Sequence, residues 1–170
     1  MSLYLPVRNP AISSGAPRSS AVSATADVLP QGSSEAETAH TVATQRRADL
    51  ILALLEAASE AGEEDWDGYG GQGVSLGSYL VAGRLLLTYP DWLPLPEISV
   101  HPDGELALDW VADKRQQFTI SIGQDGTLSY AGLFGKNKTN GKESFAGIFP
   151  PGLVTYITRV SETDVITGQR

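Results

Sequence analysis

The strongest constraint on the fold is a period-two alternation of apolar and polar residues between positions 94 and 148. The alternation comes in short runs, and turn signals separate one run from the next. Pro-Asp-Gly at 102–104 and Gln-Asp-Gly at 124–126 are such signals, because Asp and Gly favour the backbone geometry of tight turns. Short strands joined by tight turns pair with their sequence neighbours, so this stretch predicts an antiparallel meander of four to five strands.

One face of this sheet is expected to be buried and the other polar. The polar positions between the apolar ones carry short side chains, which is typical of an antiparallel sheet with one open face. Asn-Gly at 140–141 predicts the last hairpin turn, before a short strand at 144–148. The residues expected on the buried face are Leu106, Leu108, Trp110, Phe118, Ile120, Ile122, Leu128 and Tyr130.

Two helices are predicted before the sheet. The first begins near Ala43, and the second covers 75–89, with Ser75 as its N-cap and Pro90 after its end. Each has an apolar stripe at helical spacing that we expect to face the core. The stripes are Leu50, Ile51, Leu54, Leu55 and Ala58 in the first helix, and Leu76, Tyr79, Leu80, Gly83 and Leu87 in the second.

A third helix is predicted after the sheet. It opens at the proline pair 150–151 and carries Leu153, Ile157 and Val160 on one face. The fold class is therefore α+β, an antiparallel meander with two helices before it and one after, the helices packed on one sheet face. We expect a flexible N-terminal arm at 1–41, a single domain at 42–162 and a loose tail at 163–170.

The arm lacks periodicity, but it contains one apolar patch near its start. Tyr4 and Leu5 lie in an apolar run that Pro6 keeps extended, and such a segment suits docking in a groove of a partner. The alternative is an ordinary frayed terminus. If the arm of one copy crossed to another, the chain would form a homo-oligomer through residues 1–41.

Between the first two helices, the block 66–71 reads Trp-Asp-Gly-Tyr-Gly-Gly. The structural interpretation is that Trp66 fills the gap between helices and sheet, while Asp67 accepts backbone N–H groups and the glycines adopt positive φ. The functional interpretation is that Trp66 and Tyr69 form an exposed anchor, because Trp and Tyr are enriched among residues that dominate interfaces. The structural and the functional interpretation are compatible if only Tyr69 is exposed. Trp66, Asp67 and Tyr69 are thus predicted partner-binding residues, together with Tyr4 and Leu5.

Four carboxylates, Glu63, Glu64, Asp65 and Asp67, precede this block or lie within it. Their spacing resembles a calcium loop, but Val74 stands where the closing bidentate glutamate should be. A small metal-dependent hydrolase that uses the Glu63–Asp67 cluster is therefore the alternative function. A G-x-S-x-G match at 73–77 lacks the preceding strand of a nucleophile elbow, and the helix cap explains its serine. We expect no catalytic residue, no metal site and no cofactor.

Charge and composition exclude some classes of binding partner and favour one cellular compartment. The net charge is −8; residues 1–47 hold four arginines against three acidic residues, so the remainder carries −9. An acidic body repels phosphate backbones, which argues against direct nucleic-acid binding. The sequence has no apolar run long enough to span a membrane and no secretory signal pattern. Its lack of cysteine agrees with a reducing cytoplasm, where we expect the protein.

Several blocks together resemble a group of uncharacterised small bacterial and phage-associated proteins. They are Asp-Trp-Asp-Gly-Tyr-Gly at 65–70, the strand that follows Pro94, the hairpin Asp-Gly-Glu-Leu-x-Leu-Asp-Trp at 103–110, and 126–132. The resemblance covers about residues 48–160 and implies a bacterial or mobile-element context. It brings no catalytic residue with it.

These observations predict a non-enzymatic module that binds another protein. The expected role is a bacterial or phage accessory modulator or inhibitor, antitoxin-like or anti-defence-like. The alternatives are the metal-dependent hydrolase and a self-assembling structural protein with a swapped arm.

Overall fold

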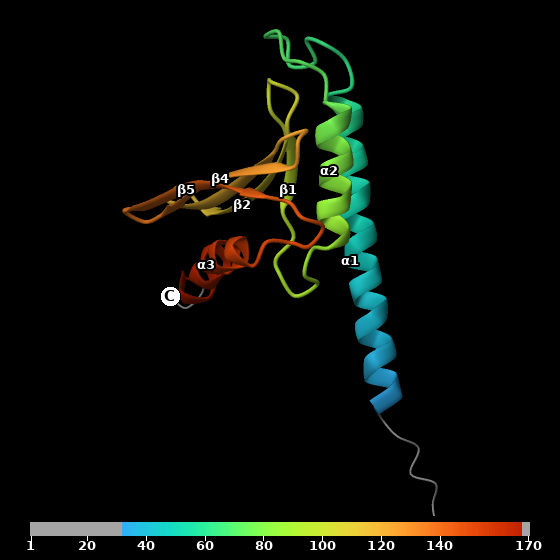
Figure 1. The fold of residues 1–170 in the computed structure, drawn as a ribbon. Helices are drawn as coiled ribbons and strands as arrows, with labels where there is room; N and C mark the ends of the chain where they lie inside the picture. Colours follow the sequence, from blue (N-terminus) through green and yellow to red (C-terminus); the bar gives the residue numbers. More distant parts are fainter. Residues whose placement is uncertain (1–31, 168–170) are drawn as a thin grey trace, which may run out of the picture.

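The computed structural model describes residues 32–167, apart from the side chains at its two ends. Two helices come first, five strands follow, and one helix closes the chain (Figure 1). In chain order the elements are α1 (Gly32–Glu60), α2 (Leu76–Leu87), β1 (Glu97–Val100), β2 (Leu106–Asp113), β3 (Gln116–Ile122), β4 (Thr127–Phe134), β5 (Asn137–Ser144) and α3 (Pro151–Thr167). The predicted α+β class is confirmed.

The strands form one antiparallel sheet in the order β1-β2-β3-β4-β5, so the predicted meander is correct. The register aligns Leu108 with Ile120 and Ile120 with Tyr130, which places the predicted apolar positions on one face. All of them are buried except Tyr130, which is half-buried. On the opposite face, Asp109 accepts hydrogen bonds from the hydroxyls of Ser99 (2.7 Å) and Thr119 (2.6 Å), which join three strands.

The last hairpin differs from the prediction. Asn140 and Gly141 lie inside β5, and the turn is earlier, where Gly135 has a φ of 67°. Gly141 pairs with Tyr130, and a Cβ at this glycine would lie 2.7 Å from the Cζ of that ring. The glycine therefore makes room for an aromatic ring across the sheet, a use that an Asn-Gly pair does not reveal in sequence.

Two helix boundaries also differ from the prediction. α1 begins at Gly32, well before Ala43, so the 32–41 part of the expected arm is helical; α3 continues to Thr167, into the expected tail. The early turns of α1 are exposed and project from the body (Figure 1). Hydroxyls of Thr38 and Thr41 donate to carbonyls one turn earlier, both at 2.8 Å. A helix without a buried face has no apolar stripe, so periodicity alone does not detect it.

α2 lies in the predicted place, but the wrong face was assigned to the core. Ser75 caps it as expected. The side toward the sheet contains Ser78, Val81, Ala82, Leu85 and Leu86, all buried. The three leucines of the predicted stripe, Leu76, Leu80 and Leu87, are exposed instead, while its Tyr79 is partly buried against the core. Similarly, Leu50 and Leu54 of α1 are buried as predicted, whereas Leu55 is exposed.

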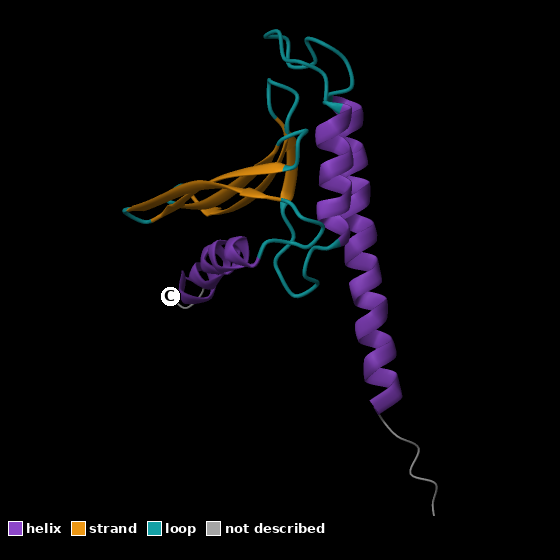
Figure 2. Ribbon diagram, in the orientation of Figure 1, coloured by secondary structure: helices purple, strands orange, loops and turns teal. Residues whose placement is uncertain are grey.

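A buried serine joins α2 to the sheet. The hydroxyl of Ser78 donates to the carbonyl of Ile122 (2.6 Å) and accepts from the N–H of Leu106 (2.9 Å). These two groups lie at the paired ends of β3 and β2, so one side chain satisfies two strands. α1 and α2 lie side by side at this end of the sheet, and α3 contacts β2, β3 and β4 (Figures 1 and 2). That all three helices cover one sheet face stays a prediction.

The core continues beyond the sheet through aromatic side chains. Tyr89 stacks on Trp110, and both donate hydrogen bonds to the carbonyl of Pro94, the indole at 3.0 Å. Burial raises the pKa of Tyr89 well above its ordinary value, so the phenol stays protonated and donates. Phe149 packs edge-on against Tyr89, and Leu153 of α3 is fully buried in the same cluster. The segment after α2 is thereby fixed to both the sheet and α3.

Candidate protein-binding site

The predicted site residues that the structure describes lie in the loop 61–75, which joins α1 to α2 and is called the aromatic loop below. Its base is tied down: Val74 N–H donates to the carbonyl of Ala61 at 2.8 Å. It is also attached to the β1–β2 turn, since Gln72 N–H donates to Pro102 O (2.8 Å) and Ser75 N–H donates to Gly104 O (2.9 Å). The loop therefore starts from a fixed platform at one end of the helix pair (Figure 1).

Two aspartates organise the tip of the aromatic loop. Oδ1 of Asp67 accepts from the N–H groups of Tyr69 and Gly71, both at 2.9 Å. Asp65, at a φ of 62°, accepts from Gly70 N–H through Oδ1 (2.8 Å) and donates its own N–H to Gly71 O (2.7 Å). The glycines at 68 and 70 have φ of 72° and 89°, where a side chain would be strained. The backbone around residue 69 is therefore held in one conformation.

The hydrogen bonds also change the acidity of Asp67. The N–H of Tyr69 has the larger effect and that of Gly71 follows; together they hold the pKa of Asp67 below its ordinary value near 3.8. The carboxylate is thus charged at neutral pH and stays an acceptor for the tip. This confirms the expected structural role of Asp67 in accepting backbone N–H groups.

The two aromatic residues of the loop differ sharply in exposure. Tyr69 is 95% exposed, while Trp66 is 36% exposed and donates its indole N–H to Gln72 O at 3.1 Å. Trp66 lines a hollow of about 250 Å³ beside the end of α1 and β1, together with Ala61 and Val100. Tyr69 therefore projects from the body, whereas Trp66 lies against it and stays partly exposed, so the interpretation in which only Tyr69 is exposed does not hold.

The acidic residues of the loop divide into two kinds. The carboxylates of Asp65 and Asp67 hold backbone N–H groups, whereas Glu63 and Glu64 are exposed. Among the side chains described at 34–161, no three His, Cys, Asp or Glu residues are grouped as a metal site would need. The predicted residues Tyr4 and Leu5 lie outside the described residues.

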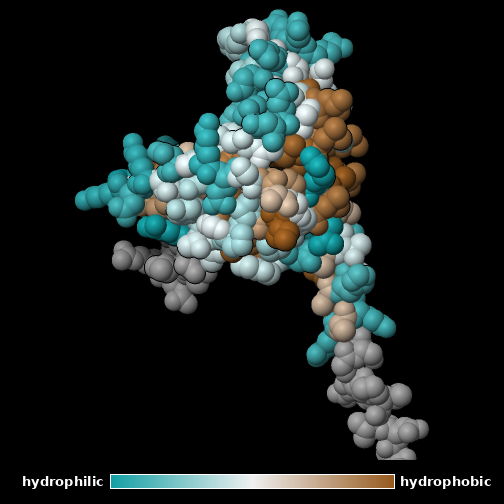
Figure 3. All heavy atoms as spheres, in the orientation of Figure 1, coloured by the Kyte–Doolittle hydropathy of each residue, from teal (hydrophilic) through white to brown (hydrophobic). Residues whose placement is uncertain are grey.

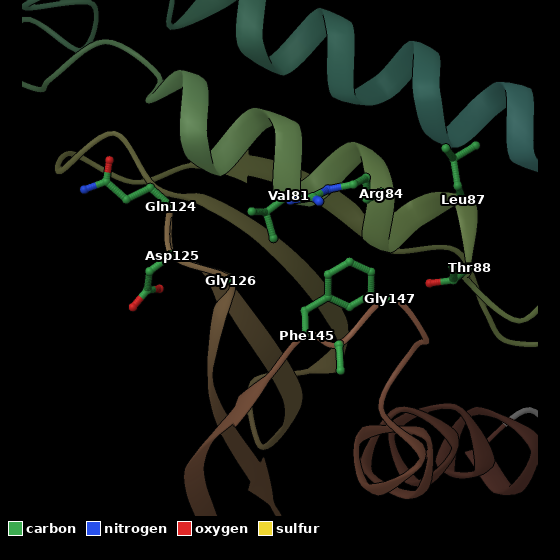
Figure 4. Close-up of a pocket in the computed structure, with 10 residues that line it drawn as sticks. Val81, Arg84, Leu87, Thr88, Gln124, Asp125, Gly126, Phe145 and Gly147 are labelled. Carbon is green, nitrogen blue, oxygen red and sulfur yellow. The ribbon is translucent and has the colours of Figure 1, made fainter.

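A larger surface hollow, of about 570 Å³, lies between α2 and the β3–β4 turn. Figure 4 shows the ring of Phe145 pointing toward α2 from one side, with Arg84 and Thr88 opposite it. Asp125 lies on its rim and accepts from Thr127 N–H and Oγ1 (2.8 and 2.9 Å), which lowers its pKa. The sequence pattern did not suggest this hollow, because its residues come from three separate segments.

A second surface was also missed. Five leucines of the helix pair are 54% to 71% exposed, and Figure 3 shows brown apolar surface along these helices. We call this surface the leucine face; it consists of Leu52 and Leu55 of α1 and Leu76, Leu80 and Leu87 of α2. One signal could have revealed it: the sequence of α2 is apolar all the way round.

No protein-family model matches the chain, and no curated protein or solved structure is significantly similar to it. The resemblance of its motif blocks to small bacterial and phage-associated proteins therefore stays a prediction. No helix in the described part combines the length and apolarity needed to cross a bilayer.

Proposed function

We propose that this chain is a non-enzymatic protein-binding module that contacts its partner through the tip of the aromatic loop. The proposed role is that of a cytoplasmic bacterial or phage accessory protein, which modulates or inhibits the protein it binds. The single observation that carries the proposal is the near-complete exposure of Tyr69 on a backbone held by Asp65 and Asp67.

The rigidity of the loop gives this exposure its weight. An exposed tyrosine on a mobile loop loses conformational entropy when a partner orders it, and this cost reduces affinity. Around Tyr69 the carboxylate of Asp67 already fixes the neighbouring N–H groups, so little backbone ordering remains. A tyrosine combines a large apolar ring with a hydroxyl that can donate or accept, which suits it to anchor an interface.

The surroundings of Tyr69 favour a partner with a basic rim. Glu63 and Glu64 are exposed in the same loop, and residues 48–170 carry a net charge of −9. Complementary charge around an anchor mainly accelerates association and selects among partners. The proposed partner surface therefore has a pocket for one aromatic ring, surrounded by lysine or arginine.

The test is an affinity capture from the native host with the full chain as bait. Tyr69→Ala removes the anchor, and Trp92→Ala is the matched control, because Trp92 is an exposed aromatic outside the loop. We expect a stoichiometric partner to be retained by the wild type and the control, and the Tyr69→Ala bait to bind it at least about tenfold more weakly. Circular dichroism of each bait verifies that it is folded.

Equal retention by Tyr69→Ala and wild type would show that the loop is not the binding site. Failure to recover any stoichiometric partner would contradict the function itself. A partner whose affinity is independent of salt would contradict only the basic rim, because attraction between exposed charges is screened as ionic strength rises.

A further inference from the structure

The leucine face needs an explanation of its own, because α2 is apolar on both sides. Its inner side packs on the sheet through buried residues such as Leu85, while its outer side exposes three leucines. A helix of a globular protein that is apolar all round is normally buried all round. α1 and α2 lie side by side, Leu52 and Leu55 of α1 are exposed as well, and Figure 3 shows apolar surface along the helix pair.

Charge is sparse on this surface and concentrated beside it. Arg84 is the one charged residue of α2 and lies one turn after Leu80, and Glu56 of α1 lies one turn after Leu52, so each charge borders a leucine of this face. Depletion of charge at the centre with charge at the rim is the composition of a protein interface. Five leucines more than half exposed on two adjacent helices also exceed the singly scattered apolar residues that are normal on a protein surface.

We propose that the leucine face is the interface of a homodimer, in which two copies stack their helix pairs into a four-helix bundle. The two-fold axis runs parallel to the helices, so that α1 of each copy lies on α2 of the other. The surface is then self-complementary, since leucines of α1 meet leucines of α2 twice. This interface is distinct from the aromatic loop and does not depend on the function proposed for it.

Two charged side chains select this arrangement. A Cβ added at Gly83 would lie 3.8 Å from Leu54 Cδ2, so these residues mark the same height on the two antiparallel helices. Arg84 and Glu56 lie one and two residues away from this level, which separates them in height by about 5 Å. Helical side chains lean toward the N-terminus of their own helix, so in antiparallel helices these two lean toward each other.

With α1 of one copy above α2 of the other, Arg84 of each copy approaches Glu56 of its partner, and the pair forms twice. The alternative two-fold, which stacks α1 on α1 and α2 on α2, does not place Arg84 on the helix that carries Glu56, so this pair does not form. Among the side chains that the structure describes, at 34–161, the one ion pair is Arg47–Asp91, so neither Arg84 nor Glu56 pairs with a charged group in that part of the chain. The bundle supplies one for both.

A membrane surface fits this face less well. Helices that lie on membranes carry Lys and Arg beside their apolar side, which attract anionic lipid. Here the flanking residues of α1 are acidic: Asp49, Glu56 and Glu60. A second copy, in contrast, offers both the apolar complement and the arginine. Each copy would contribute the five leucines and their neighbours, toward the roughly 800 Å² per partner of a standard interface.

The first experiment measures the mass of the full chain by sedimentation equilibrium over a range of concentrations. We expect a dimer, and we expect Leu80→Glu to raise its dissociation constant at least about tenfold, because it would place a charged carboxylate in the apolar contact between the two copies. Val111→Glu is the matched control, since Val111 is an exposed apolar residue of β2. Circular dichroism checks that each variant is folded. If Leu80→Glu does not fold, Leu55→Glu tests the same interface from α1.

The second experiment distinguishes the two stacking arrangements. Arg84→Glu and Glu56→Arg should each weaken the dimer about three- to tenfold, and the double variant should recover most of the loss. A monomeric wild type, or a dimer that Leu80→Glu and Leu55→Glu leave unchanged, overturns the proposal. A dimer lost on Tyr4→Ala and Leu5→Ala rather than on Leu80→Glu assigns association to residues 1–31 and overturns it equally.

Two more outcomes would count against the arrangement or the partner. Charge exchanges without effect, or without recovery in the double variant, overturn the stacking of α1 on α2. A wild-type monomer that floats with vesicles of phosphatidylglycerol and phosphatidylcholine, and is released by Leu80→Glu, identifies the face as a lipid-binding surface instead.

Discussion

The inner face of β2–β4 and the outer face of α2 both consist of large apolar side chains, yet one is buried and the other exposed. On the strands, Phe118, Ile120 and Ile122 are completely buried, and the polar residues between them face the other way. On α2, Leu85 is completely buried while Leu80 is 55% exposed. The same residue type on one helix thus lies in two environments.

The difference shows what a sequence pattern can determine. A strand has two faces, and in this sheet only one of them is apolar, so alternation identifies the buried side. α2 has apolar residues at nearly every angle, so both its buried side and its exposed side show helical spacing. Helical spacing alone therefore does not indicate which side of this helix packs on the rest of the chain.

The largest effect is expected in the sheet. Phe118→Ala removes a fully buried ring that packs against Trp110, Tyr130, Phe134 and Tyr156. We expect the free energy of unfolding to fall by about 3–5 kcal/mol, the usual cost of such a cavity. Urea denaturation followed by circular dichroism measures it. A loss below 1 kcal/mol would mean that this face is not the centre of the core.

The two sides of α2 should respond differently to the same substitution. Leu85→Ala should lower the free energy of unfolding by about 2–5 kcal/mol, whereas Leu80→Ala should lower it by less than about 1 kcal/mol at protein concentrations low enough to keep the chain monomeric. Denaturation at two concentrations separates folding from association. Equal losses for the two variants would remove the distinction between the faces.

A substitution at Ser78 tests how much the hydrogen bonds between α2 and the sheet contribute to stability. Ser78→Ala leaves the N–H of Leu106 and the carbonyl of Ile122 without their shared partner, so we expect a loss of about 1–3 kcal/mol. Ser161→Ala is a suitable control, because its hydroxyl bonds only to a carbonyl of its own helix. If urea denaturation gives the same small loss of unfolding free energy for both variants, the hydrogen bonds of Ser78 contribute little to stability.

The smallest effect is expected at the aromatic loop, where acid should loosen the tip without unfolding the body. The pKa of Asp67 is lowered in the folded chain, so its hydrogen bonds are fully present above pH 3.8 and are lost as the pH falls through the lower folded value. NMR should show the amide signals of Tyr69 and Gly71 shifting together below that pH. Asp67→Asn should abolish this titration, and amide signals that do not respond to acid would contradict the assigned role of Asp67.

The sequence predicted the sheet almost completely, because alternation and turn residues are local signals. It misplaced the last turn, since Gly141 serves a ring on the neighbouring strand rather than a bend. It missed the first turns of α1, which are helical without burying a face. For the aromatic loop, the residue types indicated how Asp67 and Tyr69 behave, but the role of Asp65 depends on a positive φ that no pattern encodes.

The long first helix has a consequence for how the predicted contact residues could cooperate. From Gly32 to Glu60 it measures about 43 Å, and the aromatic loop begins at its far end. The helix is a spacer that keeps the attachment point of residues 1–31 remote from Tyr69. A target that engaged both Tyr4 and Tyr69 would have to extend along this spacer, or the N-terminal segment would have to return along its full length.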